Sequence, residues 1–285
     1  MTATTDATAN NRPKGPLVYR QSFWTRLTHW LWVICLFFLL FSGLQIFNAH
    51  PSLYIGQQSG LEFDNAVLQM YAVNTEQGLA GRTRILGHEF DTTGVFGLSG
   101  PPARPDFQGF PSLVTIPSFR DLATGRVVHF AFAWGFVGIM LVWLIASLVN
   151  GHFRRDVVPN GADLAELPAD IGSHARFRFP KGRRYGPLQK LSYFIVLCIL
   201  FPLIILTGLT MSPGMDAAWP WLVDLFGGRQ TARTIHFVTM VLLVLFFVVH
   251  VLMVLLAGPF NELRSMVTGW YRTDADTTHR AGDRP

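Results

Sequence analysis

The chain has 285 residues, of which 50% are hydrophobic and only 14% are charged. This composition excludes an ordinary soluble globular domain and indicates a membrane protein. The formal net charge of +5 is explained by basic residues that face anionic lipid on one side of a membrane, so nucleic-acid binding is not needed to account for it.

Four apolar runs are long enough to cross a bilayer, which takes about 20 helical residues. They are Leu27 to Phe47, Val127 to Val149, Leu188 to Leu209 and Thr234 to Ala257. We therefore predict an all-α integral membrane protein, a bundle of four transmembrane helices at 23–48, 127–150, 188–211 and 233–257. The first run is not expected to be a cleaved signal peptide, because it is too long and follows the polar tail 1–22.

Lysine and arginine are concentrated in the tail 1–22, the loop 151–187 and the segment 258–285. The loops 49–126 and 212–232 carry fewer for their length, and 49–126 holds more acidic than basic residues. Because basic residues are retained on the inner side, both termini and the basic loop 151–187 are predicted to be cytoplasmic. The loops 49–126 and 212–232 are then periplasmic, in a multi-pass protein of a bacterial cell inner membrane.

The long loop 49–126 is expected to form a structure of its own, since a helical bundle needs much shorter connections. Phe63 to Tyr71 is compatible with a short helix. Gly94 to Pro117 is rich in Gly and Pro and is predicted to be extended and turn-rich.

The two ends of the chain are predicted to lie outside the bundle. The tail 1–22 is polar and is expected to be unstructured. After a helix break at Gly258-Pro259, Phe260 to Tyr271 has the apolar spacing of an amphipathic helix on the inner membrane surface. No internal repeat is evident in the sequence.

Two histidines in the fourth run, His236 and His250, are fourteen residues apart. At about 100° per residue, both imidazoles lie on nearly the same face of a helix, roughly 21 Å apart along its axis. Ionisable side chains inside a membrane are costly and indicate function, and imidazole is a ligand of haem iron. The spacing therefore predicts two cofactor levels in one bundle.

Two more intramembrane histidines complete these levels. His129, at the outer start of the second run, pairs with His236, and His29, at the inner end of the first run, pairs with His250. Each pair supplies two axial nitrogens to one iron, and a bis-histidine haem has no open position, which suits electron transfer. A hydrogen bond to a neighbouring helix is the alternative for any single intramembrane histidine, but it does not predict two matched levels.

The remaining histidines are predicted in loops or tails and are expected to be solvated or structural; they are His50, His88, His152, His174 and His279. His152 is the one rival for the inner level, although it lies beyond the break at Asn150-Gly151. No catalytic residue is predicted.

Small and basic residues near the histidines allow two interpretations. Glycines in the runs suit either a flat haem or close helix packing; they are Gly43, Gly135, Gly138 and Gly208. Arg26, Arg126 and Arg233 each lie within one turn before a histidine, where they suit either haem propionates or the membrane interface.

Several motifs together carry a family resemblance. They are Arg26-Leu27-Thr28-His29-Trp30, Arg126-Val127-Val128-His129, Leu206-Thr207-Gly208, His236 with His250, and the segment Phe260 to Gly269. With these motifs the chain resembles the membrane cytochrome b family that includes the b-type subunits of nickel-iron hydrogenases and the γ subunits of formate dehydrogenases, often described as bacterial cytochrome b561-like.

The resemblance implies two non-covalent haems b in a four-helix bundle. It implies electron transfer between a peripheral partner enzyme and the quinone pool, with the quinone near the inner haem. The long loop looks like that of b-type subunits that accompany periplasmic molybdenum oxidoreductases of the sulfite-oxidase type, and a hydrogenase is the alternative partner.

The quinone is expected near polar groups at the inner boundary, each of which is also a common type of interface residue; they are Arg26, Asn150, Gln189, Lys190 and Tyr193. Two other functions stay open. One is a stand-alone cytochrome b561 oxidoreductase, for example from superoxide to quinone. The other is a haem-free transporter or assembly factor, against which the absence of inverted repeats and broken helices weighs.

Overall fold

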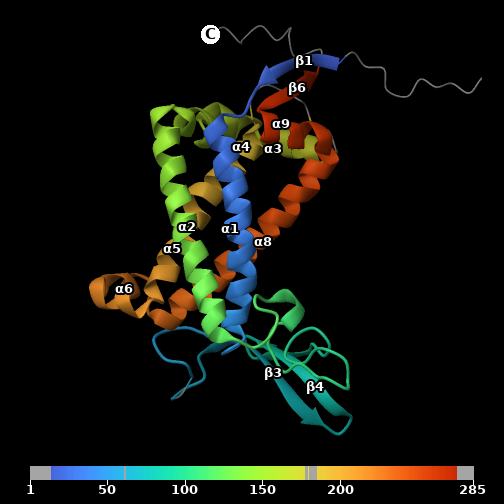
Figure 1. Cartoon of the computed structure of the whole chain (residues 1–285), viewed down its shortest axis with the longest axis vertical. Coiled ribbons are helices and arrows are strands. Elements are labelled where there is room, and N and C mark those ends of the chain that lie inside the picture. The colour runs from blue at the N-terminus through green and yellow to red at the C-terminus, as the bar shows by residue number, and fades with distance from the viewer. Residues whose placement is uncertain (1–13, 61, 177–178, 180–184, 275–285) are drawn as a thin grey trace, which may run out of the picture. The chain divides into compact units, whose positions relative to one another are not determined.

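A computed structural model of the chain describes residues 14–60, 62–176, 179 and 185–274 (Figure 1). The chain forms two compact units, each built from segments that are far apart in the sequence. One comprises Met1–Leu27, Trp143–Ile195 and Phe247–Pro285, and the other comprises Thr28–Val142 and Val196–Phe246. We name the first the terminal unit and the second the central unit.

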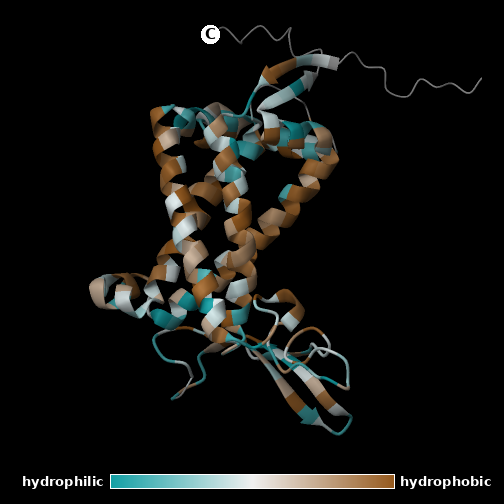
Figure 2. Cartoon of the chain, in the orientation of Figure 1, coloured by the Kyte–Doolittle hydropathy of each residue, from teal (hydrophilic) through white to brown (hydrophobic). Residues whose placement is uncertain are grey.

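Four helices are long and apolar enough to cross a membrane, as the four apolar runs predict. They are α1 (Phe23–Phe47), α2 (Leu122–Val149), a third span over Pro187–Thr210, and α8 (Arg229–Ala257). Figure 2 shows the hydrophobic residues along these helices. Large apolar side chains are exposed on them, such as Val127 at 69% and Ile145 at 62%, and this suits a surface that faces equally apolar lipid tails.

Polar caps start two of these helices. The Ser22 hydroxyl oxygen accepts a hydrogen bond from the backbone N–H of Thr25 at 3.1 Å, at the start of α1. Asp121 accepts one from the backbone N–H of Thr124 at 3.0 Å, so that α2 begins at Leu122 instead of the predicted residue 127. The first N–H groups of a helix need such acceptors. The spacing of apolar residues does not predict these capping residues.

The third span is interrupted. α4 (Pro187–Phe194) continues into a π-helical turn at Ile195–Leu200 and then into α5 (Phe201–Thr210). Pro202 lies in the first turn of α5, and because proline has no backbone N–H and its ring clashes with a preceding carbonyl, the regular α-helical ladder does not pass through it. The span predicted at 188–211 is thus present as one span over Pro187–Thr210, with a π-helical turn in its middle that the apolar run did not predict.

The connection between α1 and α2 folds into a four-stranded antiparallel sheet in the central unit. Its strands are β2 (Ser52–Tyr54), β3 (Ala66–Thr75), β4 (Gly78–Ile85) and β5 (His88–Asp91), in that spatial order. The short helix left open for Phe63 to Tyr71 does not form, because residues 66–71 belong to β3, where Met70 is buried in a cluster with Phe47 and Leu53. The all-α prediction is corrected to a mostly helical chain with some sheet.

The other connections of the central unit are short elements. The segment predicted to be turn-rich, 94–117, contains turns and a 3-10 turn at Ser112–Val114. Between α5 and α8 lie α6 (Pro213–Ala218) and α7 (Trp221–Leu225).

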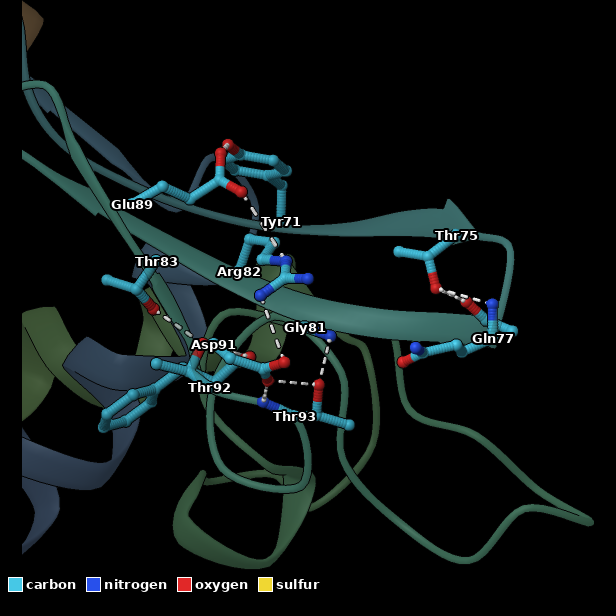
Figure 3. Close-up of polar contacts among 12 residues, drawn as sticks. Tyr71, Thr75, Gln77, Gly81, Arg82, Thr83, Glu89, Asp91, Thr92 and Thr93 are labelled. Atoms are coloured by element: carbon cyan, nitrogen blue, oxygen red, sulfur yellow. Dashed lines mark hydrogen bonds and ion pairs between the residues drawn. The ribbon is translucent and has the colours of Figure 1, made fainter.

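One face of the sheet carries a polar network (Figure 3). Tyr71 donates a hydrogen bond to Glu89 at 2.6 Å, and Arg82 forms an ion pair with Asp91 at 3.1 Å. Asp91 also accepts a hydrogen bond from the Thr93 hydroxyl at 2.7 Å. The carboxylates of Glu89 and Asp91 are at least half exposed, so each ion pair is weak by itself. Together these contacts hold three strands in one register.

The terminal unit contains a two-stranded sheet that joins the ends of the described chain. β1 (Lys14–Tyr19) is antiparallel to β6 (Trp270–Asp274). The expectation that the tail 1–22 is unstructured is wrong for β1, and residues 1–13 lie outside the described residues. The predicted amphipathic helix is α9 (Pro259–Thr268). It ends at Gly269, which has a φ of +89° and where a Cβ would lie 2.4 Å from the Tyr19 ring.

A cation–π sandwich ties three distant segments of the terminal unit together. The Arg20 guanidinium lies over the ring of Tyr185 at 4.8 Å and over that of Tyr271 at 4.5 Å. The Tyr185 hydroxyl donates to the side-chain oxygen of Gln21 at 2.8 Å. Burial raises the pKa of both phenols above the usual value, so neutral rings face the cation, as a cation–π contact requires.

The connection between α2 and the third span contains a helix, α3 (Gly161–Ala175), which begins with a capping box between Asn160 and Asp163. The Lys190 ammonium of α4 donates to the Asp163 carboxylate at 2.8 Å. Burial raises the pKa of Asp163, but the hydrogen bonds from Lys190 and Asn160 outweigh it and leave the pKa below its usual value. Four basic residues of the loop 151–187 lie outside the described residues, namely Arg178, Lys181, Arg183 and Arg184.

We expect Asp163→Asn to lower the free energy of unfolding by about 2 kcal/mol, because it leaves the Lys190 charge nearly buried without a counter-ion. The stabilisation is present above the unfolded-state pKa of Asp, about 3.9, and is lost as the pH falls through the lower folded-state pKa. Thermal unfolding in detergent at neutral pH measures this difference. Glu166→Gln, an exposed charge change on the same helix, is the control, and equal melting temperatures for the two variants would contradict the prediction.

Candidate cofactor site

The central unit brings together the predicted outer pair of histidines. His129 on α2 and His236 on α8 have ring centroids 6.5 Å apart and ring planes at 59°. Imidazole nitrogens bind transition metals at about 2 Å, so two rings on opposite sides of one metal have centroids about 6 Å apart. The observed separation therefore fits two axial ligands of a single iron.

The hydrogen bonds of His129 determine which ring nitrogen carries the proton. Its Nδ1 lies 3.2 Å from the Leu39 carbonyl oxygen and 3.2 Å from the Ser42 hydroxyl oxygen. A carbonyl only accepts, so Nδ1 carries the hydrogen. The Ser42 hydroxyl donates to the Phe38 carbonyl at 2.5 Å and accepts from Nδ1. This tautomer leaves the Nε2 lone pair for a metal.

His236 is held in the same way by the third span. Its Nδ1 lies 3.1 Å from the Thr207 hydroxyl oxygen, and the Ile204 carbonyl is its backbone hydrogen-bond partner. The Thr207 hydroxyl donates to the Leu203 carbonyl at 2.7 Å. His236 is therefore also protonated on Nδ1, and its Nε2 is available as a ligand.

Two of the four glycines make room for these rings. A Cβ at Gly43 would lie 3.2 Å from Cε1 of His129, and a Cβ at Gly208 would lie 3.3 Å from Cε1 of His236. Gly135 has only an ordinary contact at 3.7 Å with the Cys35 sulfur, and Gly138 has no neighbour within 4 Å. Gly43 and Gly208 therefore leave space for the histidine rings themselves. Neither interpretation of the glycines predicted this role.

Ser42 and Thr207 are not among the residues predicted from the sequence to have a role at the site. Both side chains are completely buried, at 0% exposure. The signal that could have found them is a hydroxyl residue followed by glycine and leucine, which occurs in the first and third apolar runs at Ser42-Gly43-Leu44 and Thr207-Gly208-Leu209.

An arginine lies three residues before each histidine of this pair. Arg126 lies over the ring of Phe130 at 5.6 Å. Arg233 donates to the His50 carbonyl at 2.5 Å and lies over the ring of Phe47 at 5.6 Å. Both guanidinium groups are thus held against aromatic rings one turn from the ligands, which supplies positive charge beside the site.

The predicted inner pair is divided between the two units. His29 belongs to the central unit, where its ring lies edge-on to Trp30 at 5.2 Å, and His250 belongs to the terminal unit. The pairing of His29 with His250 stays a prediction.

The rival histidine, His152, lies in the terminal unit. Its Nδ1 is 2.8 Å from the Asp156 carboxylate, within a π-helical turn at Phe153–Val157. We expect His152→Ala to leave the haem-to-protein ratio of the purified chain unchanged, because this contact gives the ring a structural partner on its own turn. A loss of haem in this variant would place His152 among the ligands.

The predicted quinone residues all lie in the terminal unit. Arg26 donates to the Val267 carbonyl at 2.5 Å, and Gln189 donates to the Tyr193 hydroxyl at 2.7 Å. Lys190 is paired with Asp163, as described above, and Asn150 is exposed at the end of α2. A ligand at Arg26, Gln189 or Lys190 would therefore have to replace an existing contact within the protein.

Comparison with known proteins agrees with these features. The sequence model of the family described as prokaryotic cytochrome b561 matches residues 20–269, a range that contains all four candidate spans. A relative from Azospira oryzae, named "Putative protein-methionine-sulfoxide reductase subunit YedZ1", is 25% identical over 251 residues, which are 86% of this chain and 94% of the relative.

Proposed function

The chain belongs to the prokaryotic cytochrome b561 family, a family of multi-pass membrane proteins with haem b, and we propose that it transfers electrons between a periplasmic oxidoreductase and the quinone pool through two haems. In this proposal His129 and His236 would hold the outer haem, and His29 and His250 would hold the inner haem. The observation that supports this most is the outer pair, whose two Nδ1 atoms are both protonated by their surroundings and whose rings are 6.5 Å apart.

The side chains of the central unit suit this role. Haem b, when bound, supplies a one-electron couple. Two histidine ligands would leave no iron position for oxygen or substrate, and an aromatic core lies about two helical turns along α2 from His129. In that core Phe136 and Phe201 are 2% and 4% exposed and have ring centroids 4.8 Å apart. A dry environment of this kind sets the potential of a buried metal.

The two sides of the membrane follow from the distribution of basic residues. We place the termini and α3 in the cytoplasm and the sheet β2–β5 in the periplasm of a bacterial inner membrane. The quinone is placed at the cytoplasmic side, near the inner haem and the group Arg26, Asn150, Gln189, Lys190 and Tyr193.

The sheet is the proposed docking platform for the partner enzyme. Its strands are cross-linked by the network of Tyr71, Arg82, Glu89 and Asp91 (Figure 3), so it presents a fixed surface. The relative's name supports a partner that reduces methionine sulfoxide in proteins. Such a reduction takes two electrons, and two haems can deliver them one at a time. We propose a molybdenum-dependent enzyme as partner, with a hydrogenase as the alternative.

A visible spectrum tests the proposal first. The chain is expressed with a sufficient haem supply, purified, and recorded before and after reduction. Sharp bands of reduced bis-histidine haem are expected, with two haems per chain, and a colourless protein would contradict the proposal. A haem-free transporter would show no such bands.

Two further measurements test the proposed quinone and the proposed partner enzyme separately. A reduced quinone analogue, added anaerobically, is expected to reduce both haems without any other protein. Purification through a tag on the C-terminal segment is expected to retain the periplasmic enzyme. If the purified chain, with no other enzyme bound, transferred electrons from superoxide to quinone, that result would favour the stand-alone oxidoreductase.

A further inference from the structure

The contacts of His129 and His236 form an internal repeat that is not evident in the sequence alone. In each copy, a helix supplies a backbone carbonyl, a hydroxyl three residues later and a glycine directly after it, and the next span supplies the histidine. The copies are Leu39, Ser42, Gly43 with His129, and Ile204, Thr207, Gly208 with His236. The arginine three residues before each histidine extends the repeat.

From this repeat we propose that Ser42 and Thr207 are equivalent positioning residues that set the redox potential of the outer haem and the orientation of its two ligands. The proposal rests on the proposed function, since it concerns the haem between His129 and His236. The equivalence matters because each hydroxyl acts on a different ligand of the same iron.

The direction of the effect follows from the hydrogen bonds. Each hydroxyl donates to a carbonyl of its own helix, at 2.5 Å for Ser42 and 2.7 Å for Thr207, so its oxygen accepts from Nδ1–H of the histidine. An acceptor at Nδ1–H raises the basicity of the ligating Nε2. A more basic ligand favours ferric over ferrous iron and therefore lowers the potential.

Burial makes this contact hard to replace. Both hydroxyl residues have 0% exposure, so no bulk water is available to take over the lost bond, and hydrogen bonds are stronger in such low-dielectric surroundings. The carbonyls of Leu39 and Ile204 remain as acceptors when a hydroxyl is removed. We therefore expect a partial loss of the effect from each single change.

The experiment is a redox titration of the purified protein with both haems bound. Ser42→Ala and Thr207→Ala are each expected to raise the potential of one of the two haems, the same one in both variants. The expected change in the ferric-to-ferrous ratio is about twofold to tenfold, and tenfold corresponds to about 59 mV for one electron. The double variant is expected to show roughly the sum, because the two changes act on opposite ligands.

The repeat itself provides the controls. Ser42→Thr and Thr207→Ser exchange the two hydroxyl residues between the copies of the repeat. Because each variant keeps a hydroxyl, the potential is expected to stay near the wild-type value. Thr210→Ala removes another buried hydroxyl of α5, one bonded to the Leu206 carbonyl, and is expected to leave the potential unchanged. The low-spin ferric electron paramagnetic resonance signal of the outer haem reports the ring orientation independently.

The outcomes separate this proposal from the proposed function. If the alanine variants retain two haems and unchanged potentials, or if Thr210→Ala gives the same shift, Ser42 and Thr207 are not positioning residues. If the alanine variants lose only the outer haem while the reciprocal Ser/Thr variants keep it, their positioning role is supported. If the wild-type chain binds no outer haem, the proposed function fails instead.

Discussion

His236→Ala is expected to remove the outer haem and to leave the inner one in place, which halves the haem-to-protein ratio. The variant would retain only one of the two proposed ligands, the imidazole of His129. The space of the lost ring would leave the iron without its second ligand. A single axial bond is a much weaker hold on a non-covalent cofactor. The measurement is the haem-to-protein ratio together with a redox titration, in which one of two steps is expected to disappear.

The converse variant makes this test specific. His250→Ala is expected to remove the inner haem and to retain the step that Ser42→Ala shifts. His174→Ala, on α3 of the terminal unit, is the control and is expected to bind two haems. If His236→Ala removed both haems or neither, the assignment of ligands to two separate levels would be wrong.

Gly208→Val is expected to have the second largest effect, a loss of most of the outer haem. Even a bare Cβ at this position would lie 3.3 Å from Cε1 of His236, and the two methyl groups of valine need still more space. Close-packed interiors accommodate such additions only by moving side chains. The imidazole would have to leave the Thr207 hydroxyl and turn its Nε2 away from the iron. The haem-to-protein ratio and the redox titration measure this loss.

Gly138→Val is the matched control, since it places the same residue in another membrane-spanning helix, at a position with no neighbour within 4 Å. It is expected to retain both haems. Gly43→Val, in the other copy of the repeat, is expected to repeat the loss seen with Gly208→Val. Retention of the outer haem in both repeat variants would show that the glycines do not hold the rings in place.

The helices could be predicted because their signals are local. An apolar run of about 20 residues predicts a span without knowledge of its neighbours, and all four were found. The step from His236 to His250 is likewise a property of one helix. The pairing of His129 with His236 was inferred only from their predicted depth; the two ring centroids are 6.5 Å apart, and the binding of one iron by both stays a prediction.

The role of Ser42 and the strand β3 could not be predicted, because each depends on contacts with residues that are distant in the sequence. Ser42 acts on a ring 87 residues distant, so nothing in its own run distinguishes it from an ordinary small residue. The strand β3 contains Leu68, Met70 and other apolar residues in a short run, for which periodicity does not separate strand from helix. Only its neighbours β2 and β4 decide between the two structures.

The pairing of β1 with β6 has a consequence for biosynthesis. β1 is synthesised before all four candidate spans, and its hydrogen-bond partner β6 is synthesised after them. The terminal unit therefore closes only after every span has been made and inserted, since contacts between such distant segments form late. A chain released early by a premature stop would expose an unpaired strand edge, which offers quality-control proteases a ready mark of an incomplete product.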